Sequence, residues 1–415
     1  MFKRVRGTED ILDLALHNFI LETFKKHINA YNFSQIQTPI LEPTNLFIRS
    51  LGEETDVVTK EMYTFQTSTD ESICLRPEAT ASTMRAFIEA KPTPLPWKVF
   101  SYGPMFRHER PQKGRWRQFS QINMEIIGSN AIAQDANFIK MIDHFFNEKL
   151  NLENYILKIN FLGTKNDREV YKKKLYTFLK KVDKSICNTC KIRKEKNILR
   201  VFDCKKKECK EAYLKAPKII DSLSKTSTQE WENLQDLLAI LSVNFVVDPT
   251  LVRGLDYYNK TVFEFSSNEL GAQDAFCGGG RYDDLAEELG SKEKFPSIGA
   301  SIGMGRLLML IEKMKDKLPL SQKPALHVII PMSEQQQSLA LLLADNMQAE
   351  NICTDVILDE GSMKSMMRKA NKMQANFVLI LGEEEQKTNT VTIKDMQTGE
   401  SQNIKQAKVV SFLKK

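Results

Sequence analysis

Residues 103–128 read Gly-Pro-Met-Phe-Arg-His-Glu-Arg-Pro-Gln-Lys-Gly-Arg-Trp-Arg-Gln-Phe-Ser-Gln-Ile-Asn-Met-Glu-Ile-Ile-Gly. Apolar and polar residues alternate on both sides of residues 111–114, which predicts two β-strands, 98–107 and 117–128, around a polar loop. Four arginines lie in or beside the loop: Arg107, Arg110, Arg115 and Arg117. Charge on a buried strand face is costly unless a ligand pairs with it, and guanidinium groups bind phosphates in pairs of hydrogen bonds. The stretch therefore predicts a site for a flat anion such as a nucleotide; the alternative is a surface hairpin with solvated charges.

The composition is that of an ordinary soluble protein. The chain has 415 residues, 42% hydrophobic and 27% charged, which is long enough for two or three domains. The net charge of +6 favours an anionic partner only weakly. No apolar run approaches the roughly 20 residues of a membrane helix, and the charged N-terminus lacks the apolar core of a signal peptide. Seven cysteines, an odd number, indicate reduced thiols and a cytoplasmic location.

The first two thirds of the chain mix helices and strands. Periodicity predicts a helix at 10–30 with Asp10 as its cap, a short strand at 35–40, and a Gly-rich turn at 278–280. Further predicted elements are helices at 78–90, 134–150, 283–290 and 303–316, and strands at 155–163, 244–248 and 260–266. Residues 168–230 differ in composition, being lysine-rich and helical, and read as an inserted module.

After a linker at 318–324, the chain alternates strands and helices to its end. The pattern gives strands at 326–330, 352–357 and 376–381, helices at 333–348 and 362–373, a strand pair turning at Thr398-Gly399, and a short final helix. Such alternation predicts a separate α/β domain with a mixed sheet. We therefore divide the chain into an α+β domain (1–167 and 231–320), an insertion (168–230) and an α/β domain (324–415).

Four further segments carry chemistry. Arg76-Pro77-Glu78-Ala79-Thr80 is either a capped helix start or part of a site. Arg253-Gly254-Leu255-Asp256-Tyr257-Tyr258 supplies donors, acceptors and rings, or is a polar strand edge. The glycines before Arg281 and Tyr282 let backbone approach a ligand, although a lone Gly-rich loop is weak evidence. Small residues at 297–305 precede Arg306, which suits either a phosphate or close helix packing.

A cysteine cluster lies in the insertion: Cys187, Cys190, Cys204 and Cys209. Cysteine pairs at such spacing can hold a structural zinc ion, and free thiols in a helical insert are the alternative. The neighbouring lysines could contact nucleic-acid phosphates or form an ordinary solvated surface.

These segments, in this order, resemble the bacterial-type histidyl-tRNA synthetases, a family of class II aminoacyl-tRNA synthetases. The resemblance covers essentially the whole chain, and its most specific segments are 106–115 and 253–258. It implies a class II catalytic domain, an antiparallel sheet flanked by helices, followed by an anticodon-binding domain. It also implies a homodimer that uses L-histidine, ATP, Mg²⁺ and tRNA(His), and no membrane partner.

The resemblance further implies residue roles. Arg107 would hold the α-phosphate of ATP, with Arg253 between it and the histidine carboxylate, and these two would be the catalytic residues. ATP would also be bound by Glu109, Phe119 and Arg306. The histidine pocket would be formed by these two arginines with Glu78, Ala79, Thr80, Gln121, Glu125, Tyr257, Tyr258 and Tyr282. The acceptor end of the tRNA would meet Gln112, Arg115 and Arg117.

Two positions depart from the family pattern. A glutamate usually precedes the last signature arginine, where this chain has Gly305, and a glycine is common where it has Ala79. A carboxylate nucleophile needs no general base, so the expected chemistry is alignment and charge stabilisation, and His108 is a poor candidate for a base. The alternatives are an inactive histidine-binding paralogue that regulates histidine biosynthesis and an RNA-binding regulator with a vestigial nucleotide site.

Overall fold

The computed structural model describes residues 2–53, 55–204, 206–271, 273–320, 324–359 and 361–414, and these fall into two compact units, 1–320 and 321–415. The expected linker at 318–324 includes residues 321–323, which lie outside the described residues. Within the described residues, no helix is both long and apolar enough to cross a membrane.

The first unit is built on an eight-stranded sheet whose order is β1-β5-β6-β11-β10-β9-β7-β8. Its pairings are antiparallel except at the two edges, where β1 pairs with β5 and β8 with β7 in parallel. The strands are β1 (Ser34–Gln35), β5 (Trp97–Phe106), β6 (Gln118–Ile127), β7 (Ile156–Phe161), β8 (Val246–Val247), β9 (Asn259–Ser266), β10 (Ala275–Arg281) and β11 (Ser297–Gly303). The predicted antiparallel sheet with flanking helices is confirmed.

One face of this sheet forms the main core. Along β6, Ile122, Met124 and Ile126 are at most 1% exposed and pack with residues of the flanking helices. These helices are α1 (Ala15–Asn29), α4 (Ile132–His144), α8 (Lys225–Ile240) and α10 (Met304–Ile311). Because side chains alternate along a strand, Gln121, Asn123 and Glu125 lie on the other face. The sheet therefore separates an apolar side from a polar side.

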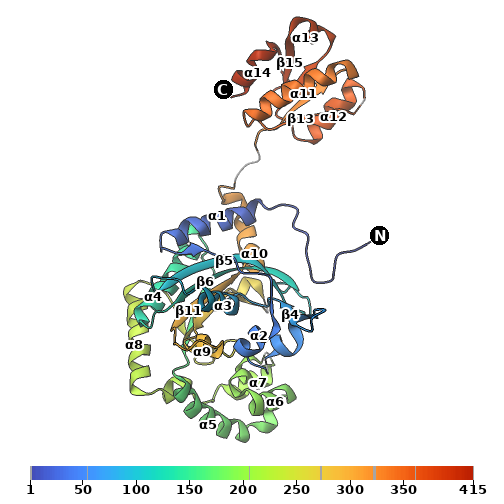
Figure 1. Ribbon diagram of the computed structural model, residues 1–415. Helices are drawn as coiled ribbons and strands as arrows, with labels where there is room; N and C mark the ends of the chain where they lie inside the picture. Colours follow the sequence, from blue (N-terminus) through green and yellow to red (C-terminus); the bar gives the residue numbers. More distant parts are fainter. Residues whose placement is uncertain are drawn as a thin grey trace. The chain divides into compact units, whose positions relative to one another are not determined.

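The polar side is enclosed by a second group of elements (Figure 1). A small sheet, β2-β4-β3, lies here with short helices. The elements are β2 (Leu41–Pro43), α2 (Thr44–Leu51), a π-helical turn (Val57–Glu61), β3 (Tyr63–Gln66), β4 (Ser72–Leu75), α3 (Thr80–Ala90) and α9 (Leu285–Glu288). Arg76, just after β4, donates from Nη1 to the carbonyl and hydroxyl of Thr38, both at 3.0 Å, and from Nε to the carbonyl of Pro104 at 3.1 Å. This buried arginine ties the small sheet to β5.

The insertion leaves the sheet after β7 and returns before β8. It is helical, as predicted: α5 (Lys165–Lys181), α6 (Asn188–Lys196), a 3₁₀ segment (Ile198–Asp203), α7 (Lys207–Tyr213) and α8, with single 3₁₀ turns at Asp183–Ser185 and Ile219–Ser222. Its base is closed by Asp167, whose carboxylate accepts from the Ser224 amide at 2.8 Å and from the Ser227 hydroxyl at 2.6 Å. Helices α5 and α8 run across the boundaries we drew at 168 and 230.

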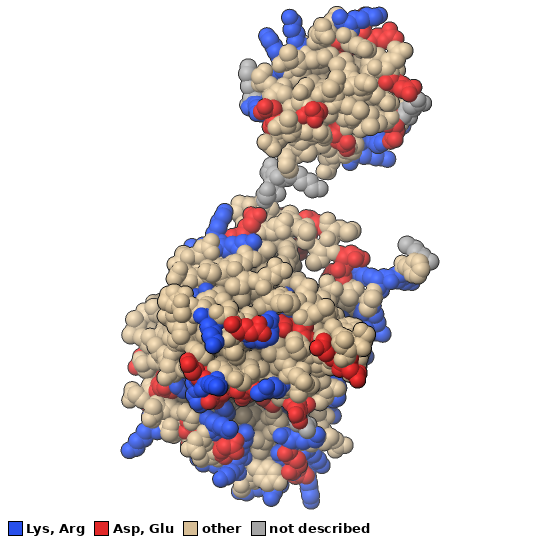
Figure 2. Space-filling view, viewed as in Figure 1, with Lys and Arg blue, Asp and Glu red and all other residues tan. Residues whose placement is uncertain are grey.

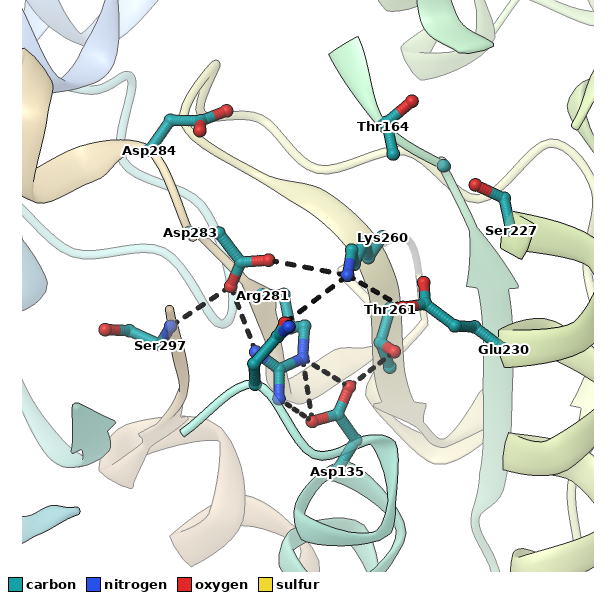
Figure 3. A network of polar contacts seen from close by, with 12 residues as sticks. Asp135, Thr164, Ser227, Glu230, Lys260, Thr261, Arg281, Asp283, Asp284 and Ser297 are labelled. Atoms are coloured by element: carbon teal, nitrogen blue, oxygen red, sulfur yellow. Dashed lines mark hydrogen bonds and ion pairs between the residues drawn. The ribbon is translucent and has the colours of Figure 1, made fainter. Parts of the chain in front are cut away.

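A buried polar network holds the end of β10 (Figure 3). Arg281, which is fully buried, binds the carboxylate of Asp135 on α4 and donates to Asp283 Oδ1 at 3.0 Å. Thr261 donates to the same Asp135 carboxylate at 2.6 Å, and Lys260 lies 3.0 Å from Glu230. Each buried charge is paired, as burial requires. The network fixes the backbone immediately before Tyr282.

The second unit is an α/β domain with the sheet order β13-β12-β14-β15-β16. Its elements are β12 (His327–Pro331), α11 (Glu334–Ala349), β13 (Thr354–Val356), α12 (Met363–Lys372), β14 (Phe377–Leu381), α13 (Glu383–Thr388), β15 (Thr390–Asp395), β16 (Ser401–Lys405) and α14 (Val409–Leu413). Strand β12 pairs in parallel with β13 and β14, whereas β15 pairs antiparallel with β14 and β16. The predicted mixed sheet is confirmed; helix α13 was not predicted.

Three local predictions are wrong. Helix α1 begins at Ala15 rather than at residue 10, and it is Asp13, not Asp10, whose carboxylate accepts from the Ala15 amide, at 2.9 Å. In place of the predicted strand at 35–40 there is only the two-residue β1. Beyond it, the carbonyl of Thr38 accepts a hydrogen bond from the Arg76 side chain rather than from a neighbouring strand. The glycines at 278–280 lie within strand β10 rather than in a turn.

Candidate active site

Glycines form the floor of the polar side of the sheet. Across the sheet, Glu125 of β6 is in register with Gly299, which is in register with Gly280; Ser301 is in register with Asn123 and Gly278, and Gly278 with Glu264. A Cβ on Gly299 would meet the Glu125 carboxyl group, and a Cβ on Gly278 would meet the Arg253 guanidinium carbon at 2.6 Å. The glycines lie in a strand because charged side chains from elsewhere in the chain lie flat against them.

Glu125 is the centre of the acidic half of the site. It is 1% exposed, accepts from the Thr80 hydroxyl at 2.7 Å and forms a short hydrogen bond with the Tyr282 hydroxyl. Burial raises the pKa of Glu125 to about 8, although both hydroxyl donors oppose that rise. The two hydroxyl groups therefore fix the position of the carboxyl group, and its raised pKa keeps it mostly protonated at neutral pH.

Glu78 lies two residues before the start of helix α3. Its carboxylate accepts from the amides of Thr80 at 2.6 Å and Ala81 at 2.8 Å, so it caps α3. Burial raises the pKa of Glu78, against the effect of these amides and of Arg107. The interpretation as a capped helix start is confirmed. Ala79, directly before the helix, is completely buried.

Three tyrosines complete this half. The rings of Tyr257 and Tyr258 have centroids 4.6 Å apart, and the ring of Tyr282 meets that of Tyr257 edge-on at 5.6 Å. Burial raises the pKa of Tyr258, so its hydroxyl stays protonated as a donor. The predicted residues from segments near 80, 125, 257 and 282 are thus brought together.

Arg253 lies between the two halves. Its Nη1 donates to Glu264 Oε2 at 2.6 Å, and its guanidinium lies 6.0 Å from the centre of the Tyr258 ring. Burial alone would lower the pKa of Arg253, but the charge of Glu264 raises it. Its Nε is buried without a hydrogen-bond partner among the described residues, as is Gln121 Oε1. Unsatisfied buried polar atoms facing a polar surface are expected where a ligand binds.

The arginine-rich half is formed by the ends of the hairpin. Arg107 donates from Nε to the carbonyl of Pro77 at 2.9 Å, and its guanidinium covers the Phe119 ring at 5.5 Å. Burial lowers the pKa of Arg306, and the charges of Arg115 and Arg107 lower it further, while Glu264 opposes them. Arg306 donates to the carbonyl of Ala275, and the Arg253 guanidinium lies against Gly278, so both arginines lie along strand β10.

The loop itself is tied back to the sheet. Arg115 forms a close ion pair with Glu109, and its Nη2 donates to Gln273 at 3.3 Å. Arg306 donates to the carbonyls of Gly114 at 2.8 Å and Ala275 at 2.6 Å. Gln112 is exposed, and Arg117 donates to the carbonyl of Glu109 at 3.3 Å. The structure therefore places Arg115 on Glu109, a pairing that the sequence did not predict.

Gly305 is explained by Trp116. A Cβ on Gly305 would meet the Trp116 ring at 2.7 Å, so the indole occupies the space that a longer side chain would need. Trp116 lies between Arg115 and Arg117, and its packing fixes the loop against α10. The two residues form one unit, and Gly305 is required by its tryptophan neighbour.

The sequence assigned no role to three residues of this site: Glu264, Gln273 and Trp116. The signal for Glu264 was present, since a lone acid alternates with apolar residues in Val262-Phe263-Glu264-Phe265. Gln273 and Trp116 act through contacts distant in sequence, which no local pattern reveals. The four cysteines of the insertion are brought together, with all four Sγ atoms within 4.8 Å of one another.

Comparisons with known proteins agree with this arrangement. Residues 15–307 match the family model for histidyl-tRNA synthetase, and residues 327–415 match that for an anticodon binding domain. The histidine–tRNA ligase of Thermosipho melanesiensis is 41% identical over 99% of this chain and 98% of its own length, and that of Halothermothrix orenii is 40% identical over 100% and 99%. The crystal structure of apo S. aureus histidyl-tRNA synthetase superimposes with a TM-score of 0.81 at 32% identity, covering all of both chains.

An antiparallel sheet with a charged, glycine-floored face, joined to a mixed-sheet domain, defines a class II aminoacyl-tRNA synthetase fold. Within that class, the matches in sequence and structure extend over the entire chain. The chain belongs to the histidyl-tRNA synthetase family.

The raised pKa of Glu125 predicts a pH dependence of stability. Between its ordinary value near 4.5 and about 8, the folded protein keeps a proton that the unfolded chain releases, so the free energy of unfolding falls as pH rises. We expect Glu125→Gln to flatten this fall. Tryptophan emission during urea unfolding at pH 5 to 8 measures it, because Trp97, Trp116 and Trp231 all lie in the first unit. The exposed Glu293→Gln is the control, and equal slopes for the wild type and Glu125→Gln would contradict the prediction.

Gly305→Glu should overpack the Trp116 contact. We expect the free energy of unfolding to fall by about 1–3 kcal/mol, measured by circular dichroism in urea. Adding Trp116→Ala should restore most of the loss, since the two changes act on one contact. Strictly additive effects would show that the indole does not occupy this space.

Proposed function

We propose that this chain is an enzyme, a histidine–tRNA ligase. It joins L-histidine to ATP as histidyl-adenylate, releasing pyrophosphate, and then transfers histidine to the 3′ end of tRNA(His). The observation that carries the proposal is that the Arg253 guanidinium, against Gly278, and the buried carboxyl group of Glu125, against Gly299, share one glycine-lined face of the sheet. The family membership of the whole chain supports it.

The acidic half suits histidine. An imidazole ring offers one donor and one acceptor at fixed positions, which Glu125 and Tyr258 can match. Thr80 and Tyr282 fix Glu125 from two sides, and Glu78, Ala79, Gln121 and Tyr257 complete the proposed pocket. A site that hydrogen-bonds its substrate rejects analogues by roughly 10⁴–10⁵ without a proofreading domain.

The arginine-rich half suits ATP. Phe119 offers a ring face to the adenine and Glu109 an acceptor for its amino group, while Arg107 and Arg306 would hold phosphate oxygens. Arg107 is anchored through Nε to Pro77, and this leaves its outer nitrogens for the ligand. Phosphate-bound Mg²⁺ would neutralise developing charge, and Glu264, which pairs with Arg253, is a carboxylate that could help to hold it.

The first step needs alignment rather than a base. The carboxylate of histidine, already ionised, attacks the α-phosphorus in line with the departing pyrophosphate. Arg253 lies where it can bind both the carboxylate and the α-phosphate, with Glu264 and Gly278 fixing its position. Its charge stabilises the oxygens on which negative charge develops.

For the second step, we propose that tRNA contacts Gln112, Arg115 and Arg117 with its acceptor end and residues 324–415 with its anticodon. Because Arg115 pairs with Glu109, this contact requires the ion pair to open. We propose the same order of domains as before, with 1–167 and 231–320 catalytic and 168–230 an added module, except that helices α5 and α8 move the ends of the module to residues 165 and 240. On the face drawn in Figure 2, basic side chains of the first unit are interspersed with acidic ones.

The inactive paralogue is the second candidate. By the resemblance, such paralogues lose the segment corresponding to 253–258 or the C-terminal domain, and this chain keeps both.

We further propose a cytoplasmic location.

Histidine-dependent exchange of pyrophosphate into ATP tests the function, since only the ligase catalyses it. We expect Arg253→Ala to lower the exchange rate on the order of 10²–10³-fold with an unchanged circular dichroism spectrum. The exposed Lys294→Ala is the matched control. No exchange by the wild type would overturn the proposed reaction, and a variant that keeps more than half the rate would overturn the role of Arg253.

We also propose a homodimer. Large apolar side chains are exposed in the N-terminal segment and near the small sheet: Ile11, Leu12, Leu14, Ile40, Leu41 and Phe65. Ile40, Leu41 and Phe65 lie in or beside strands β2 and β3 of the small sheet, and exposed apolar side chains on one sheet indicate an interface. The mass of the full chain in solution, by light scattering, should be twice that of the 47.6 kDa chain; a monomer at micromolar concentration would contradict the proposal.

A further inference from the structure

The four cysteines of the insertion form a compact group of sulfur atoms. Cys187 and Cys190 lie at the start of α6, Cys204 follows the 3₁₀ segment, and Cys209 lies in α7. Their Sγ atoms all lie within 4.8 Å of one another, and those of Cys187 and Cys204 are 3.9 Å apart. Among the described residues, no other group of three or more potential metal ligands is found.

These distances fit one tetrahedral ion. With Zn–S bonds of about 2.3 Å, the sulfur atoms of a tetrathiolate are about 3.8 Å apart. A disulfide would instead require a distance of about 2.05 Å, and all four thiols are free. The backbone amide of Cys187 donates to Cys209 Sγ at 3.2 Å. Such amide donors stabilise metal-bound thiolates and orient them.

A metal centre would help to order the local structure. Between residues 183 and 213 the three largest elements are α6, the 3₁₀ segment and α7, of nine, six and seven residues. Helices this short are marginal by themselves, and small modules usually depend on a disulfide or a metal. The apolar residues buried here are few: Ile186, Ile198, Val201 and Tyr213.

The segment between the second and third cysteines contacts the loop that carries Arg253. Asn197 donates to Asp256 Oδ1 at 2.8 Å. Arg193 and Arg200 lie 3.6 and 3.8 Å from the carboxylate of Asp56, beside α2, and Arg193 donates to the carbonyl of Arg200 at 3.1 Å. Asp256 is three residues after Arg253, so whatever fixes residues 191–203 also restrains the 251–258 loop.

We propose that Cys187, Cys190, Cys204 and Cys209 bind one structural zinc ion, and that the ion positions the 251–258 loop through the segment 191–203. The ion takes no part in the reaction. The cysteines act as positioning residues, because none of them contacts the charged face of the sheet on which the arginines converge.

Metal analysis of the full chain, purified without chelators, tests the site. We expect close to one zinc per chain, lost in Cys204→Ser and retained in Cys353→Ser, whose thiol is exposed and outside the cluster. Replacing zinc with cobalt(II) should give the visible absorption of a tetrahedral tetrathiolate. Zinc below about a tenth of an equivalent, its retention in Cys204→Ser, or iron in its place would overturn the assignment.

Hydrogen exchange tests the positioning. Removing zinc from the wild type with a chelator should speed amide exchange in 191–203 and 251–258, while 327–381 in the other unit stays unchanged, and re-added zinc should reverse the effect. This comparison needs no variant and no measurement of activity, so it stands apart from the proposed reaction. Faster exchange in 191–203 alone would show that the ion does not restrain the loop, and no change anywhere would overturn the whole proposal.

Discussion

The candidate active site depends on the burial of ionisable side chains against glycines in the middle of a sheet. Arg253 and Glu125 can lie flat on β10 and β11 because Gly278 and Gly299 leave their space empty. Each buried polar group then has a partner: Glu264 for Arg253, and the hydroxyls of Thr80 and Tyr282 for Glu125. Without partners, the burial of these groups would cost more than the fold could offset.

The same constraint explains the glycines that were wrongly assigned to a turn. A run of three glycines is usually flexible, and by local sequence a turn is the natural assignment. Here the strand is specified by its neighbours β9 and β11 and by the Arg281 network at its end, so it does not depend on local propensity. Gly in the interior of a strand then marks a close approach by another group, which in this chain is the guanidinium of a residue 25 positions earlier.

The features that the sequence predicted are set by patterns within short segments. Most of those that it did not predict are set by contacts between segments that meet on folding. Strands β5 and β6 follow from alternation within ten residues each, and the C-terminal domain from alternating periods, so both were predicted. The contacts of Trp116 with Gly305 and of Arg115 with Gln273 depend on which residues meet after folding. The cap of α1 is local, but Asp10 and Asp13 suit it equally by residue type. The site residues themselves were named through the resemblance; the geometry adds the partners that hold them.

The position of the insertion explains how an added module can influence the site. It connects β7 to β8 and β9 at one edge of the sheet, where β7 and β9 pair antiparallel, so a connection of any length leaves the sheet unchanged. Loop-closure entropy grows only slowly with length, so such an insertion destabilises the eight-stranded sheet little. Two ties link it to that domain: Asp167 closes its base, and Asn197 reaches the loop that carries Arg253. A tie made by one exposed amide–carboxylate bond is weak unless the segment that carries Asn197 is itself rigid. The cysteines flank that segment on both sides, which is where a rigid centre has most effect on the arginine three residues before Asp256.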